Sequence, residues 1–176
     1  MENSRKVILY IAASLDGYIA REDGGIDWLQ GDGSDPQGDL GYFKFYETID
    51  TVIMGKTTYD QVLTFGEYPY KGIKNYVFTS ESRDNRDDVI FTNENVKELI
   101  DKLKRETGKS IWVIGGAGIL DYFMKENLID EYIISIIPTI LGKGISLFKG
   151  YNPEINLQLK HSKSINGIVE VHYVKK

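Results

Sequence analysis

The chain has 176 residues, of which 41% are hydrophobic and 27% charged, and its formal net charge is −5. These values are typical of one soluble globular domain, expected to span residues 1–176. The acidic balance argues against nucleic acid or an anionic membrane as main partner. The absence of cysteine excludes disulfides and thiolate catalysis, and two histidines near the C-terminus argue against a histidine metal cluster, so no metal is expected.

The first predicted element is a buried strand over Val7–Ala13. Arg5 and Lys6 before this run give it a faint resemblance to a secretion signal, but Leu15–Ala20 continues the pattern of a folded element. No stretch approaches the roughly 18 apolar residues that a membrane span requires. We therefore expect no membrane partner and a cytoplasmic location.

A long loop rich in glycine and aspartate, Ser14–Gly38, follows the first strand. Loops of this length in a compact domain are usually functional. Ser34 and Pro36 form the start pattern of a helix, which predicts a helix over 36–48.

The remaining segments alternate between strand and helix patterns. They are a strand over Thr51–Met54, a helix over Thr57–Leu63, a strand over Lys74–Thr79, a charged turn over Glu81–Asp88, a strand over Val89–Thr92, a helix capped by Asn93 or Asn95 and ending near Glu106, a strand over Ile111–Ile114, a helix over Ile119–Lys125, a strand over Tyr132–Ile137, and strands over Leu157–Ile165 and Ile168–Val174.

This alternation predicts an α/β fold with a largely parallel sheet and helices on both faces. Asn166-Gly167 is a strong two-residue hairpin signal, so the last two strands are expected to add an antiparallel edge. Ligands of such sheets bind beyond the carboxyl ends of the strands. The loops after Ala13, Met54, Thr79 and Ile114 are therefore expected to converge on one cleft.

The stretch Ile111–Leu120 combines a buried strand with three glycines and the start of a helix. Glycines let the backbone approach a ligand closely, and helix N–H groups favour a phosphate; a tight turn without a ligand is the alternative. The stretch lacks the dinucleotide fingerprint, because Asp121 stands where its last glycine belongs.

Gly55-Lys56-Thr57 ends like a phosphate-binding P-loop, but Asp50 stands where the first glycine of that motif belongs, so we reject a P-loop. A strand followed by glycine, lysine and two hydroxyls still suits a phosphate. The alternative is that Thr57 caps a helix and Lys56 is solvated.

Asp39 and three aromatic residues have the spacing of one helix face, where a carboxylate can hold the edge of a flat heterocycle while a ring packs on it. The alternative is that the acid favours the helix dipole and the aromatics are core. The aromatic residues are Tyr42, Phe43 and Tyr46.

Together these segments resemble the dihydrofolate reductase fold family. The resemblance is carried by Asp39–Lys44, Val52–Thr58, Asn75–Ser80 and Val113–Gly116, in that order, and covers about residues 6–150. It implies a three-layer α/β/α fold with a mainly parallel mixed sheet and a C-terminal antiparallel hairpin.

The resemblance also implies NADPH as hydride donor and a set of contacts to it. These contacts are Ala13, Ile19, Gly55, Lys56, Thr57, Thr58, Thr79, Ser80, Gly115, Gly116, Ala117, Gly118 and Ile119. It assigns the substrate-binding acid to Asp39, its hydroxyl partner to Ser135, further substrate contacts to Trp28, Tyr42 and Phe43, and a mobile active-site loop to Asp16–Gly33. A buried carboxylate would hold the tautomer of the heterocycle and help relay a proton to it.

Two segments, Ser14–Ala20 and Pro138–Gly144, are more similar to the reductase domain of riboflavin biosynthesis. Gly25–Leu29 departs from the S-x-W-I-T segment of true riboflavin reductases, and Leu120 stands where dihydrofolate reductases usually carry tyrosine. The resemblance therefore predicts an NADPH-dependent reductase of a flat nitrogen heterocycle, dihydrofolate- or pterin-like. The alternative is a 5-amino-6-(5-phosphoribosylamino)uracil reductase.

A non-enzymatic nucleotide or flavin carrier is an alternative of another class. Such carriers need a hydroxyl-rich phosphate loop after the first strand, where Ser14–Gly17 offers one hydroxyl and an acid that would repel phosphate. A homodimer is also expected if Ile133–Ile137 and the C-terminal hairpin expose an apolar edge.

Overall fold

The computed structural model describes residues 5–150 and 152–176. Its elements are β1 (Val7–Ser14), β2 (Tyr18–Ala20), α1 (Tyr42–Tyr46), β3 (Ile49–Gly55), α2 (Lys56–Val62), a 3₁₀ turn (Leu63–Phe65), β4 (Lys74–Phe78), β5 (Val89–Thr92), α3 (Val96–Arg105), β6 (Ser110–Gly115), α4 (Ala117–Lys125), β7 (Glu131–Ile137), β8 (Ile145–Ser146), β9 (Leu157–Ile165) and β10 (Ile168–Lys175).

One sheet of eight strands has the order β5-β4-β3-β6-β1-β7-β10-β9. The strands from β5 to β7 pair in parallel, whereas β10 pairs antiparallel with both β7 and β9. A separate antiparallel pair joins β2 to β8. The predicted mainly parallel sheet with a C-terminal antiparallel hairpin is confirmed.

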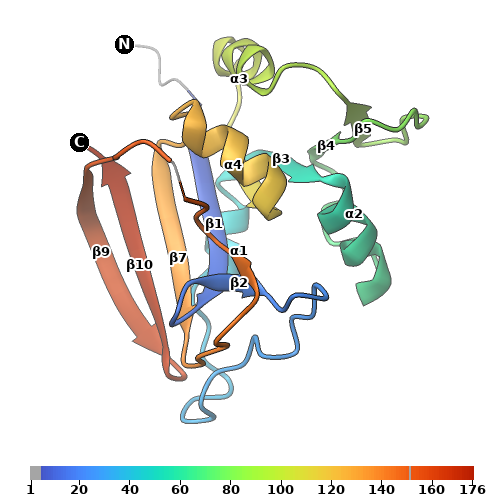
Figure 1. Cartoon of the computed structure of the whole chain (residues 1–176). Helices are drawn as coiled ribbons and strands as arrows, with labels where there is room; N and C mark the ends of the chain where they lie inside the picture. Colours follow the sequence, from blue (N-terminus) through green and yellow to red (C-terminus); the bar gives the residue numbers. More distant parts are fainter. Residues whose placement is uncertain (1–4, 151) are drawn as a thin grey trace.

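The sheet lies between two layers of helices, because alternate strand residues point to opposite faces. On β6, Ile111 and Val113 belong to the core beneath α3 and α4, whereas Trp112 belongs to the core beneath α1 and α2. Figure 1 shows α4 in front of the strands and α1 behind them. The predicted three-layer α/β/α arrangement is therefore present.

Asn95 caps α3, which settles the choice between Asn93 and Asn95. Its side-chain oxygen accepts the backbone N–H groups of Lys97 at 2.9 Å and Glu98 at 3.2 Å. These bonds satisfy donors that the first helical turn leaves without partners. The buried face of α3 consists of Val96, Leu99, Ile100 and Leu103.

The C-terminal hairpin has the predicted strands and turn. Asn166 and Gly167 have φ angles of 53° and 72°, as a tight hairpin turn requires. The expectation that Ile133–Ile137 lies at an apolar edge is wrong, because these residues belong to β7, which lies between β1 and β10. The edge strand is β9, and most of its residues are polar.

The predicted helix over 36–48 is much shorter in the structure, where α1 covers Tyr42–Tyr46 alone. Gly41 has φ 82°, a left-handed conformation that an α-helix cannot continue. Ser34 does not cap a helix; its hydroxyl donates to Asp32 at 2.5 Å. Asp39 therefore precedes the helix instead of sharing one of its faces.

The segment Ser14–Gly38 is not entirely loop, because it contains the short strand β2. Asp16 ties this region to the distant segment before β8: its carboxylate accepts the N–H groups of Leu141 at 3.0 Å and Gly142 at 2.7 Å. Ser14 also donates to Asp16 at 2.7 Å, and this bond is the main reason that the pKa of Asp16 is lowered. The Asp16 carboxylate therefore holds this loop against the segment before β8.

Arg5 joins the amino ends of three strands from a buried position. Its guanidinium pairs with Asp50, donates to the Thr51 hydroxyl at 2.7 Å, and donates to the Lys109 carbonyl at 2.7 Å. The Arg5 side chain is 3% exposed, so these partners replace its hydration almost completely.

We predict that Arg5→Ala lowers the free energy of unfolding by about 3 kcal/mol, because it leaves Asp50 and the carbonyl without their buried partner. Urea unfolding followed by circular dichroism measures the change. The matched control is Lys71→Ala, which removes an exposed ion pair with Glu67 and is expected to cost less than about 1 kcal/mol. Equal effects of the two variants would contradict a structural role for Arg5.

Candidate functional site

A groove runs along the carboxyl edge of the parallel strands. Its apolar end is a cavity of about 540 Å³, and its polar end is a cavity of about 790 Å³. Both are lined by Gly55, Thr57, Gly118 and Ile119, so the two cavities adjoin. The loops after β1, β3, β4 and β6 thus converge as predicted.

The apolar end lies between β1, α2 and the loop that follows β2. Ile11, Ile19 and Ile119 supply aliphatic walls, while Thr57 and Thr58 supply hydroxyls. Gln61 donates to the Gly24 carbonyl at 2.9 Å, which ties the loop to α2. The predicted active-site loop therefore forms one wall of the groove.

At the polar end, hydroxyls and charged groups replace the aliphatic side chains. Lys56, Thr79 and Ser80 line it, together with Asn95 at the start of α3. Gly118, in the first turn of α4, leaves space here: a Cβ at this position would meet no atom within 4 Å. The N–H groups at the start of α4 favour a negatively charged ligand here.

Four charged side chains form one cluster at the polar end. Lys56 contacts Asp60 at 2.8 Å and Glu81 at 3.5 Å, and Arg83 contacts the same two acids at 3.1 and 3.2 Å. The bond to Asp60 raises the pKa of Lys56, and the bond to Lys56 lowers the pKa of Asp60. Both cations already have partners, so a phosphate would compete with Asp60 and Glu81 for them.

The structure brings most of the predicted cofactor residues to this groove. They are Ile19, Gly55, Lys56, Thr57, Thr58, Thr79, Ser80, Gly116, Ala117, Gly118 and Ile119. Ala13 is buried beside the lining residue Ala12. Gly115 is buried below the groove with φ 118°, joined to Gly116 by a cis peptide.

The structure does not bring the predicted substrate contacts to the groove. Trp28 is 6% exposed and donates to the Gly25 carbonyl at 3.3 Å, inside its own loop. Tyr42 packs edge-on against Trp112 with a centroid distance of 6.0 Å, while Phe43 on the neighbouring position of α1 is 74% exposed.

Asp39 and Ser135 also lie outside the lining of the groove. The Asp39 carboxylate is exposed, not buried as expected, and accepts the N–H groups of Gly41 at 2.8 Å and Tyr42 at 3.3 Å. Ser135 is buried on β7 and donates to Glu170 at 3.4 Å. Burial raises the pKa of the Tyr10 phenol most; Glu170 and Asp39 raise it further, and Ser135 lowers it.

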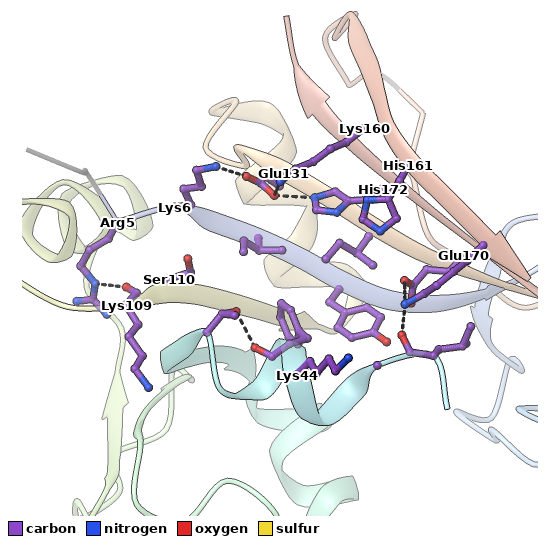
Figure 2. Close-up of a pocket in the computed structure, with 18 of the residues that line it drawn as sticks. Arg5, Lys6, Lys44, Lys109, Ser110, Glu131, Lys160, His161, Glu170 and His172 are labelled. Atoms are coloured by element: carbon purple, nitrogen blue, oxygen red, sulfur yellow. Dashed lines mark hydrogen bonds and ion pairs between the residues drawn. The ribbon is translucent and has the colours of Figure 1, made fainter. Parts of the chain in front are cut away.

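A second cavity, of about 550 Å³, lies between the sheet and α1 (Figure 2). We call it the cavity under α1. Its wall is rich in cations: Arg5, Lys6, Lys44, Lys109, Lys160 and Lys163. Two buried acids, Glu131 and Glu170, lie among them.

Glu131 and His172 both line this cavity and contact each other. His172 Nε2 lies 2.6 Å from Glu131 Oε2, and Lys6 pairs with the other carboxylate oxygen (Figure 2). Burial opposes ionisation of Glu131, but the bonds to Lys6 and His172 outweigh it and lower its pKa. Burial lowers the pKa of His172, so the ring stays neutral where an exposed histidine would take up a proton.

Tyr10 lines both the groove and the cavity under α1. Its ring packs edge-on against Phe45 with a centroid distance of 4.6 Å. Burial raises the pKa of the Tyr10 phenol most, and the negative charge of Glu170 raises it further. The phenol therefore stays protonated at neutral pH.

Two lining residues, Tyr10 and Glu170, and the nearby Arg83 of the charged cluster were missed in the sequence. Tyr10 lies inside a strand that carried no polar signal beyond its own hydroxyl, and Glu170 lies in a hairpin outside the family resemblance. Arg83 follows Ser80 by three positions, a spacing that could have suggested a second cation.

The model of one protein family, described as the RibD C-terminal domain, matches residues 5–169. The chain belongs to this family. The uncharacterized protein YwjB of Bacillus subtilis is 47% identical over 173 residues, covering 97% of this chain and 98% of YwjB.

Two solved structures place the fold in the dihydrofolate reductase-like superfamily. A candidate riboflavin biosynthesis protein from Shewanella sp. PV-4 superposes with a TM-score of 0.85 at 30% identity, covering 97% of this chain and 99% of that one. Dihydrofolate reductase from Enterococcus faecalis, complexed with NADP(H) and RAB-propyl, gives a TM-score of 0.67 at 18% identity, covering 97% and 96%. The second likeness concerns the fold alone.

We predict that stability falls as the pH drops below about 6.5, the ordinary pKa of histidine, because the unfolded chain then binds a proton that buried His172 resists. Loss of the Glu131 contacts adds to the fall below about pH 4.5. The measurement is the urea midpoint at pH 7.5 and pH 5.

In the variant His172→Gln, which keeps an N–H donor for Glu131, the difference between the two midpoints is expected to shrink. The control is His161→Gln, since the His161 ring packs edge-on against His172 with a centroid distance of 4.9 Å and also lines the cavity. The assignment to His172 fails if His161→Gln, and not His172→Gln, removes the difference.

Proposed function

We propose that this protein is an NADPH-dependent reductase that transfers a hydride, in the groove, to a substrate that carries a flat nitrogen heterocycle. The observation that carries the proposal is the groove itself: an apolar cavity suited to a nicotinamide and a heterocycle adjoins a polar cavity with hydroxyls, the Lys56 ammonium group and a helix start. Membership of the RibD C-terminal domain family supports the same activity.

The residues of the groove fit NADPH. Thr57 and Thr58, with the N–H groups at the start of α4, would hold the pyrophosphate; Lys56 and Ser80 would hold the 2′-phosphate. The nicotinamide would lie against Ile19 and Ile119, and it supplies the hydride when bound. A Cβ at Gly116 would approach Thr58 Oγ1 to 3.1 Å, so glycine keeps this narrow passage clear.

For the substrate, family membership favours a ribosylaminopyrimidine of the riboflavin pathway over dihydrofolate. The family match and the Shewanella relative both point toward riboflavin biosynthesis, whereas the likeness to dihydrofolate reductase concerns the fold alone. The exposed position of Asp39 also differs from the buried acid that we expected to hold a pterin. We therefore place 5-amino-6-(5-phosphoribosylamino)uracil first and dihydrofolate second.

The flavin carrier is less well supported. Its phosphate loop would follow β1, where the acid of Asp16 is already committed to the N–H groups of Leu141 and Gly142. A purified carrier would be yellow, and this protein is expected to be colourless. Turnover of NADPH with the pyrimidine, and its absence with flavin alone, tests the proposal.

We predict that kcat/KM for NADPH exceeds that for NADH by at least about tenfold, because a charge-assisted contact to the 2′-phosphate contributes roughly 1.5–3 kcal/mol. Lys56→Gln is expected to reduce this preference, and Asp60→Asn to increase it by releasing Lys56 from its ion pair. Lys71→Gln, far from the groove, serves as the control. Equal kcat/KM values for the two cofactors in the unmodified protein would rule out the phosphate assignment.

We further predict that Asp39→Asn lowers kcat at pH 7 about tenfold or more while the Kd for NADPH changes less than about threefold. Asparagine keeps the side-chain oxygen that accepts the Gly41 and Tyr42 N–H groups, so the variant removes the charge and leaves the turn intact. Stopped-flow rates and NADPH fluorescence provide the two measurements. An unchanged kcat would reduce Asp39 to a residue that only orders the start of α1.

A further inference from the structure

The proposed reduction requires a proton as well as a hydride. Reduction of a C=N bond adds a hydride to the carbon and a proton to the nitrogen, and a positioned side chain usually delivers the proton. Among the described residues that line the apolar end of the groove, no side chain carries a carboxylate, an imidazole or an ammonium group. The proton must therefore come from a phenol, another hydroxyl or water.

Two phenols border this end of the groove, Tyr10 and Tyr70. Tyr70 packs edge-on between Tyr68 and Trp112, each with a centroid distance of 5.5 Å. Tyr10 also lines the cavity under α1, and Glu170 lines the same cavity. Of the two phenols, Tyr10 is the one that has a carboxylate beside it.

Glu170 lines the cavity under α1 and contacts Lys163 and Ser135. The carboxylate side chain is 5% exposed, and its two oxygens lie 2.9 Å from Lys163 Nζ and 3.4 Å from Ser135 Oγ. Lys163 is 35% exposed and lines the same cavity, and it also donates to the Leu40 carbonyl. Figure 2 shows Glu170 at the wall of this cavity, which the Tyr10 side of β1 also lines.

We propose that Tyr10 is the proton donor of the groove and that Glu170 reloads it from the cavity under α1. The inference rests on the proposed function. With the open-chain imine of the ribosylaminopyrimidine as acceptor, the hydride adds to the sugar carbon of the C=N bond. The phenol O–H bond breaks as an N–H bond forms on the nitrogen that joins sugar and pyrimidine, and a proton from solvent, passed through Glu170, restores the phenol. Ser135 is then a positioning residue, because its hydroxyl holds Glu170.

The coupling between Tyr10 and Glu170 can be measured in the ligand-free chain. Replacing Tyr10 by 3,5-difluorotyrosine, whose phenol ionises at lower pH, makes its titration observable by fluorine NMR. The charges that face it are Glu170, Asp39 and Lys163. In Glu170→Gln the titration midpoint is expected to move to lower pH, because a negative charge is removed. The same label at Tyr173, which points to the other face of the sheet, is the control.

The groove-facing role has its own measurement. Tyr10→Phe is expected to lower kcat for reduction of the pyrimidine substrate about 100-fold, the size of a general-acid contribution. The Kd for NADPH is expected to change less than about threefold. The control Tyr173→Phe is expected to stay within about twofold. Difluorotyrosine at position 10 is also expected to change its fluorine shift when NADPH is added.

The outcomes distinguish a failure of the proposed reductase function from a failure of the Tyr10–Glu170 proposal. If neither the pyrimidine nor dihydrofolate is reduced by the unmodified protein, the proposed function fails, and the ligand-free titration still judges the link from Tyr10 to Glu170. If a substrate is reduced and Tyr10→Phe keeps its kcat, Tyr10 is not the donor. A midpoint of the label that does not respond to Glu170→Gln overturns the reloading path.

Discussion

The pairing of β1 between β6 and β7 is the constraint on which both cavities depend. Parallel register aligns Leu9 with Val113 on one side and with Tyr132 on the other, so the carboxyl ends of these strands form one edge. Because side chains alternate along β1, Ile11 and Tyr10 lie on opposite faces of the sheet; both line the groove, and Tyr10 also lines the cavity under α1. A shift of one residue in this register would exchange the two faces and destroy the site.

The walls of the groove are then fixed by contacts between segments distant in sequence. Asp16 holds the segment before β8 through two backbone N–H groups, and Gln61 holds the loop after β2. The hairpin turn secures the next part of that loop, since the Asn166 carbonyl accepts the N–H of Asp32 at 2.9 Å. Gly31 permits this approach: a Cβ there would lie 2.2 Å from the same carbonyl oxygen.

Most of the fold was predictable from the sequence, because it follows from local signals. The buried runs gave β1, β3 and β6 within about two residues of their bounds, and Asn166-Gly167 gave the hairpin. The helix over 36–48 failed because Gly41, at φ 82°, needed a conformation that spacing alone does not reveal. Of the candidate site, the lining of the polar end was predictable from glycines and hydroxyls that follow strands. The position of Glu170 was not, because it depends on which strand pairs with β7.

The central claim is that the groove at the carboxyl edge, and not the cavity under α1, binds NADPH. Backbone amide shifts of the ligand-free chain, recorded while NADPH is added, test it most directly. The account predicts saturable shifts at Thr57, Thr79 and Gly118, with Lys160 and His161 unchanged. Shifts confined to the residues of the cavity under α1, or none at millimolar NADPH, would contradict it.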